Sequence, residues 1–261
     1  MLKTLWAYRF FIISSIITEF RSRFARSKLG GAWMVLHPLA QVAIYALVLS
    51  AVLSAKLPGI DNRYAYAIYL MAGTLGWSLF SEVLVRSLNI FIENANLLKK
   101  VMFPKLALPL VLTGSALITN ALLCIAILVV FGLLDHLPSL TLFWIPFLTL
   151  LTLALALGLG LSLGILNVFI RDIGQIIPII LQFWFWLTPV VYSTQMIPEK
   201  YHTLMLINPM TGIVMSYHDV LVYNKMPDVS LLIYPAIIAI VGLVLALVMY
   251  KGANEEMADV L

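Results

Sequence analysis

Few residues in this chain have the types and spacing that chemistry requires. His136, His202 and His218 fall in predicted outer segments, where Asp219 or Glu199 could in principle join them in an acid–base site. No nucleophile or second carboxylate accompanies them at a convincing spacing, and no cluster of His, Cys and carboxylate residues has metal-ligand spacing. The sequence therefore predicts no catalytic residue and no metal site.

Nucleotide and nucleophile motifs are missing from the sequence. It contains no GxxxxGK(S/T) phosphate loop, no GxSxG nucleophile elbow and no HExxH zinc motif. Its apolar stretches also lack the buried carboxylates of a proton-coupled carrier. The energy for any transport must therefore come from another polypeptide, and we expect no cofactor on this one.

Composition sets the class of protein. Of the 261 residues, 62% are hydrophobic and 11% are charged, whereas a soluble domain has about 25% charged residues. The apolar runs are continuous, which favours membrane helices over a barrel of alternating strands. We predict an all-α integral membrane protein with a single transmembrane domain, residues 1–261. The basic residues lie at the ends of the apolar runs, so the net charge of +4 does not indicate nucleic acid.

The order of apolar runs predicts six transmembrane helices. These lie at about residues 33–55, 66–92, 106–134, 141–166, 176–192 and 229–250. Residues 193–228 form a long outer segment with two short helices, Pro198–Leu206 and Pro209–Tyr223, each starting at a proline. Most basic residues fall in the inner segments of this layout, which predicts both termini in the cytoplasm.

An amphipathic helix is predicted over residues 4–28. Apolar residues recur there at spacings of three and four, and polar residues fall largely on the other face. Basic residues disfavour burial in lipid, so we expect this helix to lie in the membrane interface. The alternative is an ordinary first span with a frayed end.

The basic segment Glu93–Lys105, ENANLLKKVMFPK, lies between two apolar runs and marks a cytoplasmic loop. It is either a turn that only fixes topology or a docking element for a cytoplasmic partner. Glu82 and Arg86, four residues apart in the preceding span, can form an ion pair. In the fourth span, small residues from Gly158 to Gly164 favour close helix packing within the chain over a dimer face.

The chain resembles the membrane subunits of polysaccharide-exporting ABC transporters of the O-antigen, capsule and teichoic-acid branch. The resemblance covers nearly the whole chain. The matching stretches are FRSRFARSKLGGAWMVLHPL, ENANLLKKVMFPK, NVFIRDIGQ and FWLTPVVYSTQMIPEKYHTLMLINPMTGIVMSYHDVL.

The resemblance implies a permease in the cell inner membrane that works with a second copy of itself and two copies of a separate ATPase, which binds ATP and Mg. The substrate would be a lipid-linked polysaccharide, with O-antigen on undecaprenyl diphosphate as the first choice and capsule or teichoic acid as the alternatives. The loop 93–105 would be the coupling helix, the amphipathic start a gate helix, and 193–228 a pair of re-entrant extracytoplasmic helices. The coupling residues would be Asn96, Leu97, Leu98, Lys99, Lys100, Phe103 and Pro104.

Two further sets of site residues follow from physical arguments. Arginine can bond two phosphate oxygens at once, so the basic face of the gate helix is predicted to present the lipid diphosphate; plain anchoring to anionic lipid is the alternative. That face holds Arg21, Arg23, Arg26 and Lys28. Aromatic rings can stack on sugars, or can simply anchor at the lipid interface. The candidates for the glycan path are Tyr45, Trp77, Phe183, Trp184, Phe185, Trp186 and Tyr192.

Three other classes of function compete with this one. An exporter of drugs or small lipids would belong to the same superfamily. A glycan polymerase, an acyltransferase or another glycan-modifying enzyme would need catalytic residues in the outer segment 193–228. A structural scaffold would not need a basic inner loop of this pattern.

Overall fold

The computed structural model describes residues 8–24, 28, 30–53, 64–95, 107–253 and 256–260, and every regular element within them is helical. The α-helices are α2 (Arg9–Phe24), α3 (Trp33–Leu53), α4 (Ala65–Glu93), α6 (Ala107–Leu133), α7 (Ile145–Phe169), α8 (Ile173–Leu187), α9 (His202–Leu206), α10 (Pro209–Leu221), α11 (Val229–Ala253) and α12 (Glu256–Val260). The 3-10 helices are η1 (Gly30–Ala32), η2 (Leu140–Trp144), η3 (Thr194–Met196) and η4 (Glu199–Tyr201). The predicted all-α class is confirmed for these residues.

Four segments among the described residues are long and apolar enough to cross a membrane: α4, α6, the continuous stretch Leu140–Phe169, and α11. They have 25 to 30 residues, and a crossing helix needs about 20. The first predicted span is the helix α3, with 21 residues, and the fifth corresponds to α8, with 15. The six-span count therefore stays a prediction.

Helix α8 ends earlier than the predicted fifth span, which ran to residue 192. The helix stops at Leu187, and Thr188 has an extended backbone with φ −99° and ψ 135°. Thr188 precedes Pro189, whose ring clashes with a helical conformation at the residue before it. The polypeptide therefore turns at Thr188–Val190 and starts the segment that contains η3, η4 and α9.

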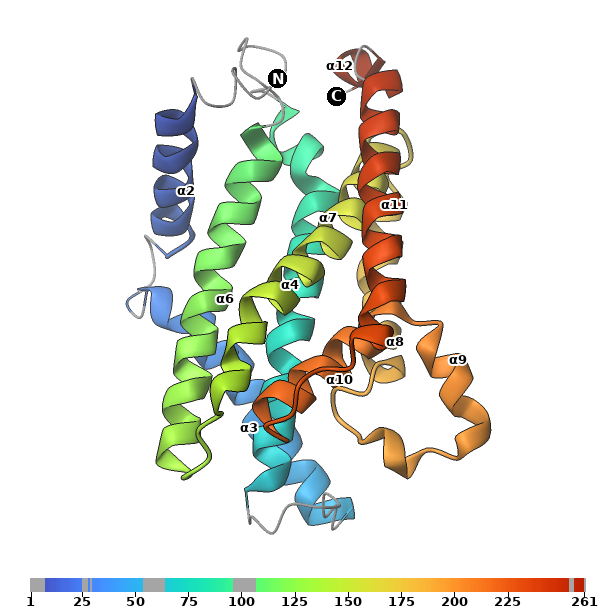
Figure 1. Cartoon of the computed structure of the whole chain (residues 1–261). Coiled ribbons are helices and arrows are strands. Elements are labelled where there is room, and N and C mark those ends of the chain that lie inside the picture. Colours follow the sequence, from blue (N-terminus) through green and yellow to red (C-terminus); the bar gives the residue numbers. More distant parts are fainter. Residues whose placement is uncertain are drawn as a thin grey trace.

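Helix α4 is the centre of the bundle. It contacts α3, α6, α7, α8 and α10, and Figure 1 shows it behind α6 and α7. In its apolar stretch 78% of the residues are buried, against 28% in α6 and in α11. The outward sides of α6 and α11 therefore present apolar side chains, such as Ile125 and Ile240, that require lipid or another protein around them.

Small residues set the distance between α4, α7 and α11. A Cβ added at Gly164 would lie 2.5 Å from the carbonyl oxygen of Ser87, and one at Gly160 would lie 2.9 Å from that of Leu84. On the other side of α7, a Cβ at Gly158 would lie 2.7 Å from the amide nitrogen of Leu243. The predicted close packing of these small residues within the chain is thereby confirmed.

Helix α10 starts at a proline, as predicted. Asn208 caps it, because its side chain accepts a hydrogen bond of 2.9 Å from the amide of Met210. Most of the helix is buried, and it contacts α4, α7 and α11. The 3-10 helix η2, which precedes α7, is bonded to it, since Thr141 Oγ1 donates to the carbonyl oxygen of Val220 at 3.0 Å.

Helix α2 lies alongside the first half of α6 (Figure 1). Ile16 of α2 is the nearest neighbour of Gly114, and Glu19 bonds to Ser115 one residue further along α6. The apolar side chains of Phe10, Ile13 and Ile17 are exposed. This packing differs from a helix lying flat in the membrane interface, so that part of the prediction for residues 4–28 is not confirmed.

The close contact of α7 with α4 leads to a stability prediction. Gly164→Ala should lower the thermal unfolding midpoint of the purified protein, because the added methyl group meets backbone atoms and the helices must separate. Overpacking of this kind costs about 1–3 kcal/mol. Gly252→Ala is the matched control, since its Cβ would meet nothing within 4 Å. Equal midpoints for the two variants would contradict the close-packing argument.

Candidate functional site

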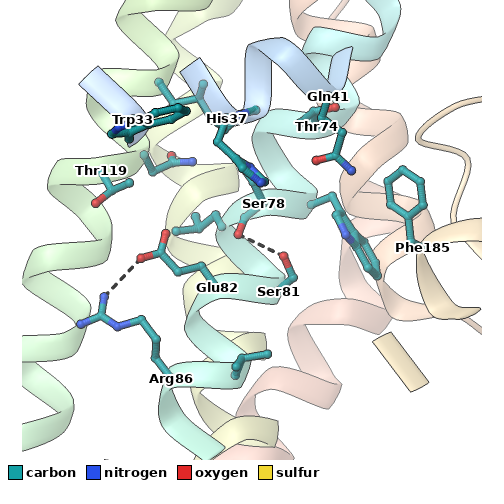
Figure 2. Close-up of a pocket in the computed structure, with 16 residues that line it drawn as sticks. Trp33, His37, Gln41, Thr74, Ser78, Ser81, Glu82, Arg86, Thr119 and Phe185 are labelled. Carbon is teal, nitrogen blue, oxygen red and sulfur yellow. Dashed lines mark hydrogen bonds and ion pairs between the residues drawn. The ribbon is translucent and has the colours of Figure 1, made fainter. Parts of the chain in front are cut away.

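Two adjoining cavities form a groove between α3, α4, α6 and α8. The first has a volume of about 560 Å³ and the second about 440 Å³. Both are lined by Gln41, Trp77, Ser81, Val85 and Phe185, so we treat them as one feature, the α4 groove. In Figure 2, Trp33 and Phe185 lie on opposite sides of the first cavity.

Helical spacing explains how the chain builds this groove. On α4, the lining residues Thr74, Ser78, Ser81 and Val85 recur at spacings of three and four, which places them on one face of the helix. On α3, the lining residues Trp33, His37 and Gln41 are four apart. The other faces of α4 pack against α7 and α10, so the groove has one rigid wall.

Three of the seven predicted path aromatics line the groove. Trp77 and Phe185 are both 8% exposed, with ring centroids 5.6 Å apart, and Trp186 is 54% exposed in the second cavity. Phe183 is 70% exposed and, like Tyr192, does not line either cavity. The side chain of Tyr45 lies outside the described residues.

Trp184, which is also predicted for the glycan path, does not line either cavity. Its ring packs edge-on against Phe80, and its Nε1–H donates to Asn208 Oδ1 at 2.7 Å. Asn208 Nδ2 donates to Thr188 Oγ1 at 2.8 Å, and Thr188 Oγ1 donates to the carbonyl oxygen of Trp184 at 2.9 Å. We call these three residues the Asn208 clasp, and they fix the end of α8 against the start of α10.

Hydroxyl groups of the groove expose hydrogen-bond acceptors. Ser78 donates to the carbonyl oxygen of Leu75 at 3.3 Å, and Ser81 donates to that of Ser78 at 3.3 Å. Each hydroxyl has used its only proton on its own helix and retains acceptor lone pairs. The wall of α4 therefore suits a ligand rich in hydroxyl donors.

An ionic network closes one end of the groove. Arg86 donates to Glu82 at 3.3 Å, which confirms the predicted pair, and also to Ser115 at 2.9 Å. It forms a second ion pair with Glu19 of α2, and Ser115 donates to the same carboxylate at 3.0 Å. Sequence reasoning missed Glu19 and Ser115, which are distant in the chain. The only signal was the polar face of the first helix.

A further cavity, of about 740 Å³, lies behind this network between α2, α4 and α6. The polar residues Ser15, Thr18 and Glu19 of α2 line it. Arg86 lines this cavity as well as the groove, so the guanidinium separates the two spaces.

The three histidines considered for catalysis are hydrogen-bonded to backbone carbonyl groups. Each is within hydrogen-bond distance of a carbonyl oxygen: His136 of Leu221 at 3.1 Å, His202 of Ile197 at 3.0 Å, and His218 of Tyr69 at 3.1 Å. Burial lowers the pKa of His218 to about 3, so its ring is neutral. These bonds give each of the three rings a structural role.

Two predicted sets of site residues cannot be placed. The coupling residues Asn96–Pro104 lie outside the described residues, as do Arg26 and the side chains of Arg21 and Arg23. Lys28 is exposed. The coupling and diphosphate roles stay predictions.

The apolar helical bundle and its polar and aromatic groove are typical of a membrane-embedded transport protein. Residues 12–222 match the ABC-2 type transporter family, and the chain belongs to this family.

Several relatives have names that state their functions. The O-antigen export system permease protein RfbA of Myxococcus xanthus is 28% identical over 265 residues, covering 99% of this chain and 98% of the relative. The protein of the same name from Klebsiella pneumoniae is 28% identical over 232 residues, with 86% of each chain covered. The polysialic acid transport protein KpsM of Escherichia coli is 23% identical over 247 residues, with 92% of each covered. The family resemblance stated from the sequence is confirmed.

The ion pair between Glu19 and Arg86 is predicted to attach α2 to the bundle. Glu19→Gln and Arg86→Gln should each lower the thermal unfolding midpoint. The midpoint of the double variant should be only slightly below that of the less stable single variant. This corresponds to a coupling free energy on the order of 1 kcal/mol. Glu256→Gln, an exposed carboxylate on α12, is the control for loss of charge. Additive effects of the two substitutions would contradict the coupling.

Proposed function

We propose that this chain is the permease subunit of a transporter that exports a lipid-linked polysaccharide across the cell inner membrane. It would act as two copies together with two copies of a separate ATPase. The single observation that carries the proposal is the α4 groove, whose aromatic rings and hydroxyl acceptors match the chemistry of a glycan. The functions named for the relatives agree with it.

The two kinds of group on a sugar explain this match. A pyranose ring carries C–H groups that pack on an aromatic face, and hydroxyl groups that need acceptors. Trp77, Phe185 and Trp186 supply the aromatic faces, and the serines of α4 supply acceptors. Contacts of both kinds line the same cavities, so a chain of sugars could move along them without leaving its hydroxyls unpaired.

O-antigen on undecaprenyl diphosphate is the substrate we favour, because the O-antigen permeases are more similar to this chain than the polysialic acid protein is. The polysialic acid relative keeps capsule export as the alternative. A glycan-modifying enzyme is disfavoured, since His136, His202 and His218 are bonded to backbone carbonyl groups.

The topology we propose has six spans with both termini in the cytoplasm. In the bundle, the C-terminal end of α4, the start of α6 and α12 lie at one end, and α10 lies toward the other (Figure 1). The basic residues Lys99, Lys100 and Lys105 belong to the loop between α4 and α6. Basic loops stay on the cytoplasmic side, so we assign the α10 end to the outside.

The proposed path can be tested on α8. Trp186→Ala should reduce the glycan at the cell surface about two- to tenfold at unchanged protein level, if stacking on a sugar contributes as much as an aromatic pair. Phe183→Ala is the matched control, because Phe183 is on the same helix, is more exposed and does not line the groove. Equal export by the two variants would refute the path along α8.

The coupling role of the loop is tested by replacing Leu97, Leu98 and Phe103 with Asp. The triple variant should keep its thermal unfolding midpoint but lose co-purification of the ATPase and export, because a docking surface needs its apolar side chains. The control places Asp at Leu137 and Leu140, which are 66% and 80% exposed at the α10 end. Unchanged export by the triple variant would rule out docking at this loop.

A further inference from the structure

A separate polar cavity of about 210 Å³ lies at the α10 end of the bundle. It is lined by Tyr69, Ser193, Thr194, Met215, His218, Asp219, Tyr223 and Lys225. None of these residues lines the α4 groove. We call this cavity the Asp219 pocket.

The inner wall of the Asp219 pocket is rigid. The rings of Tyr69 and His218 stack with centroids 3.6 Å apart, and His218 Nε2 is 3.1 Å from the carbonyl oxygen of Tyr69. The Tyr69 hydroxyl donates to the carbonyl oxygen of Tyr192 at 3.0 Å. These bonds join α4, α10 and the segment after α8, so the pocket keeps its shape without a ligand.

The carboxylate of Asp219 is the group in this pocket that is available to bind a ligand. It is half-buried, and the structure gives it no hydrogen bond or ion pair with any other described residue. Burial raises its pKa to about 6, and nearby Lys225 only partly offsets this effect. A carboxylate can only accept hydrogen bonds, so the donors for Asp219 come from water or from a ligand that takes its place.

The mixture of charges favours a ligand without net charge. A phosphate would meet the carboxylate of Asp219, and a cation would meet the ammonium of Lys225. The described residues contain no group of three His, Cys, Asp or Glu that could hold a metal ion. A sugar suits all the lining groups, because a carboxylate accepts from two neighbouring hydroxyls and a tyrosine ring packs on C–H groups.

The volume limits the size of the ligand. Pockets for drug-sized molecules have about 300–1,000 Å³, and this one has about 210 Å³. It has room for one sugar unit and not for a stretch of glycan. Tyr69 precedes Trp77 by eight residues on α4, which is about 12 Å along the helix, so the pocket lies outward of the groove.

We propose that the Asp219 pocket binds one neutral sugar unit of the glycan on the outer side of the transporter. The assignment to the outer side and to an exported glycan rests on the proposed function. The binding of a neutral sugar rests only on the residues of the pocket.

The test measures binding of methyl glucoside, methyl galactoside and methyl mannoside to the purified full chain by saturation-transfer NMR. At least one should bind, and Asp219→Asn should weaken it about tenfold, the effect expected for a hydrogen bond to a charged group. Asp228→Asn is the control, because Asp228 is bonded to Ser230 and lies outside the pocket. Inorganic phosphate and Mg²⁺ should not compete.

Lack of binding by all three glycosides, equal binding to Asp219→Asn and wild type, or competition by phosphate or Mg²⁺ would overturn the proposal. If Asp219→Asn does not fold, Tyr223→Leu tests the same pocket and should weaken binding likewise. The assay needs neither ATP nor a membrane gradient. Failure of glycan export in cells would therefore refute the proposed function, and loss of glycoside binding would refute the pocket.

Discussion

The close approach of α7 to α4 and α11 is the constraint on which the rest of the structure depends. Apolar helices gain little from contact with each other when lipid is equally apolar, so small residues that let backbones approach carry the association. Gly160 and Gly164 bring α7 against α4, and Gly158 faces Gly242 of α11. These contacts bury most of α4 and make it the fixed element of the bundle.

A fixed α4 can carry two kinds of site on different faces. The face with Ser78 and Ser81 lines the α4 groove, and the face with Gly73 and Gly76 receives His218 and Tyr217 of α10. Two of the other groove walls, α3 and α8, have fewer neighbouring helices within the described residues than α4 does. Movement that widens the groove is therefore expected in α3 and α8 before α4.

Local patterns in the sequence predicted much of the fold and little of the site. Continuous apolar runs located the long helices, Pro209 marked the start of α10, and the small residues near Gly160 predicted close packing. Pairings between distant residues left no local pattern, as for Glu19 with Arg86 or Trp184 with Asn208. The predicted i, i+4 pair of Glu82 with Arg86 was found because helical geometry alone brings its members together.

The early end of α8 shows why Trp184 is a structural residue. With 15 residues, α8 is about 22 Å long, shorter than the roughly 30 Å apolar layer of a bilayer. In the proposed six-span topology its last turn ends within this apolar layer, where irregular backbone is tolerated only if protein surrounds it and bonds its polar groups. The Asn208 clasp meets this requirement, because Asn208 bonds Trp184, Thr188 and the amide of Met210 at once. Trp184 supplies the indole N–H at this junction, and the proposed glycan path uses the neighbouring aromatic residues Phe185 and Trp186 instead.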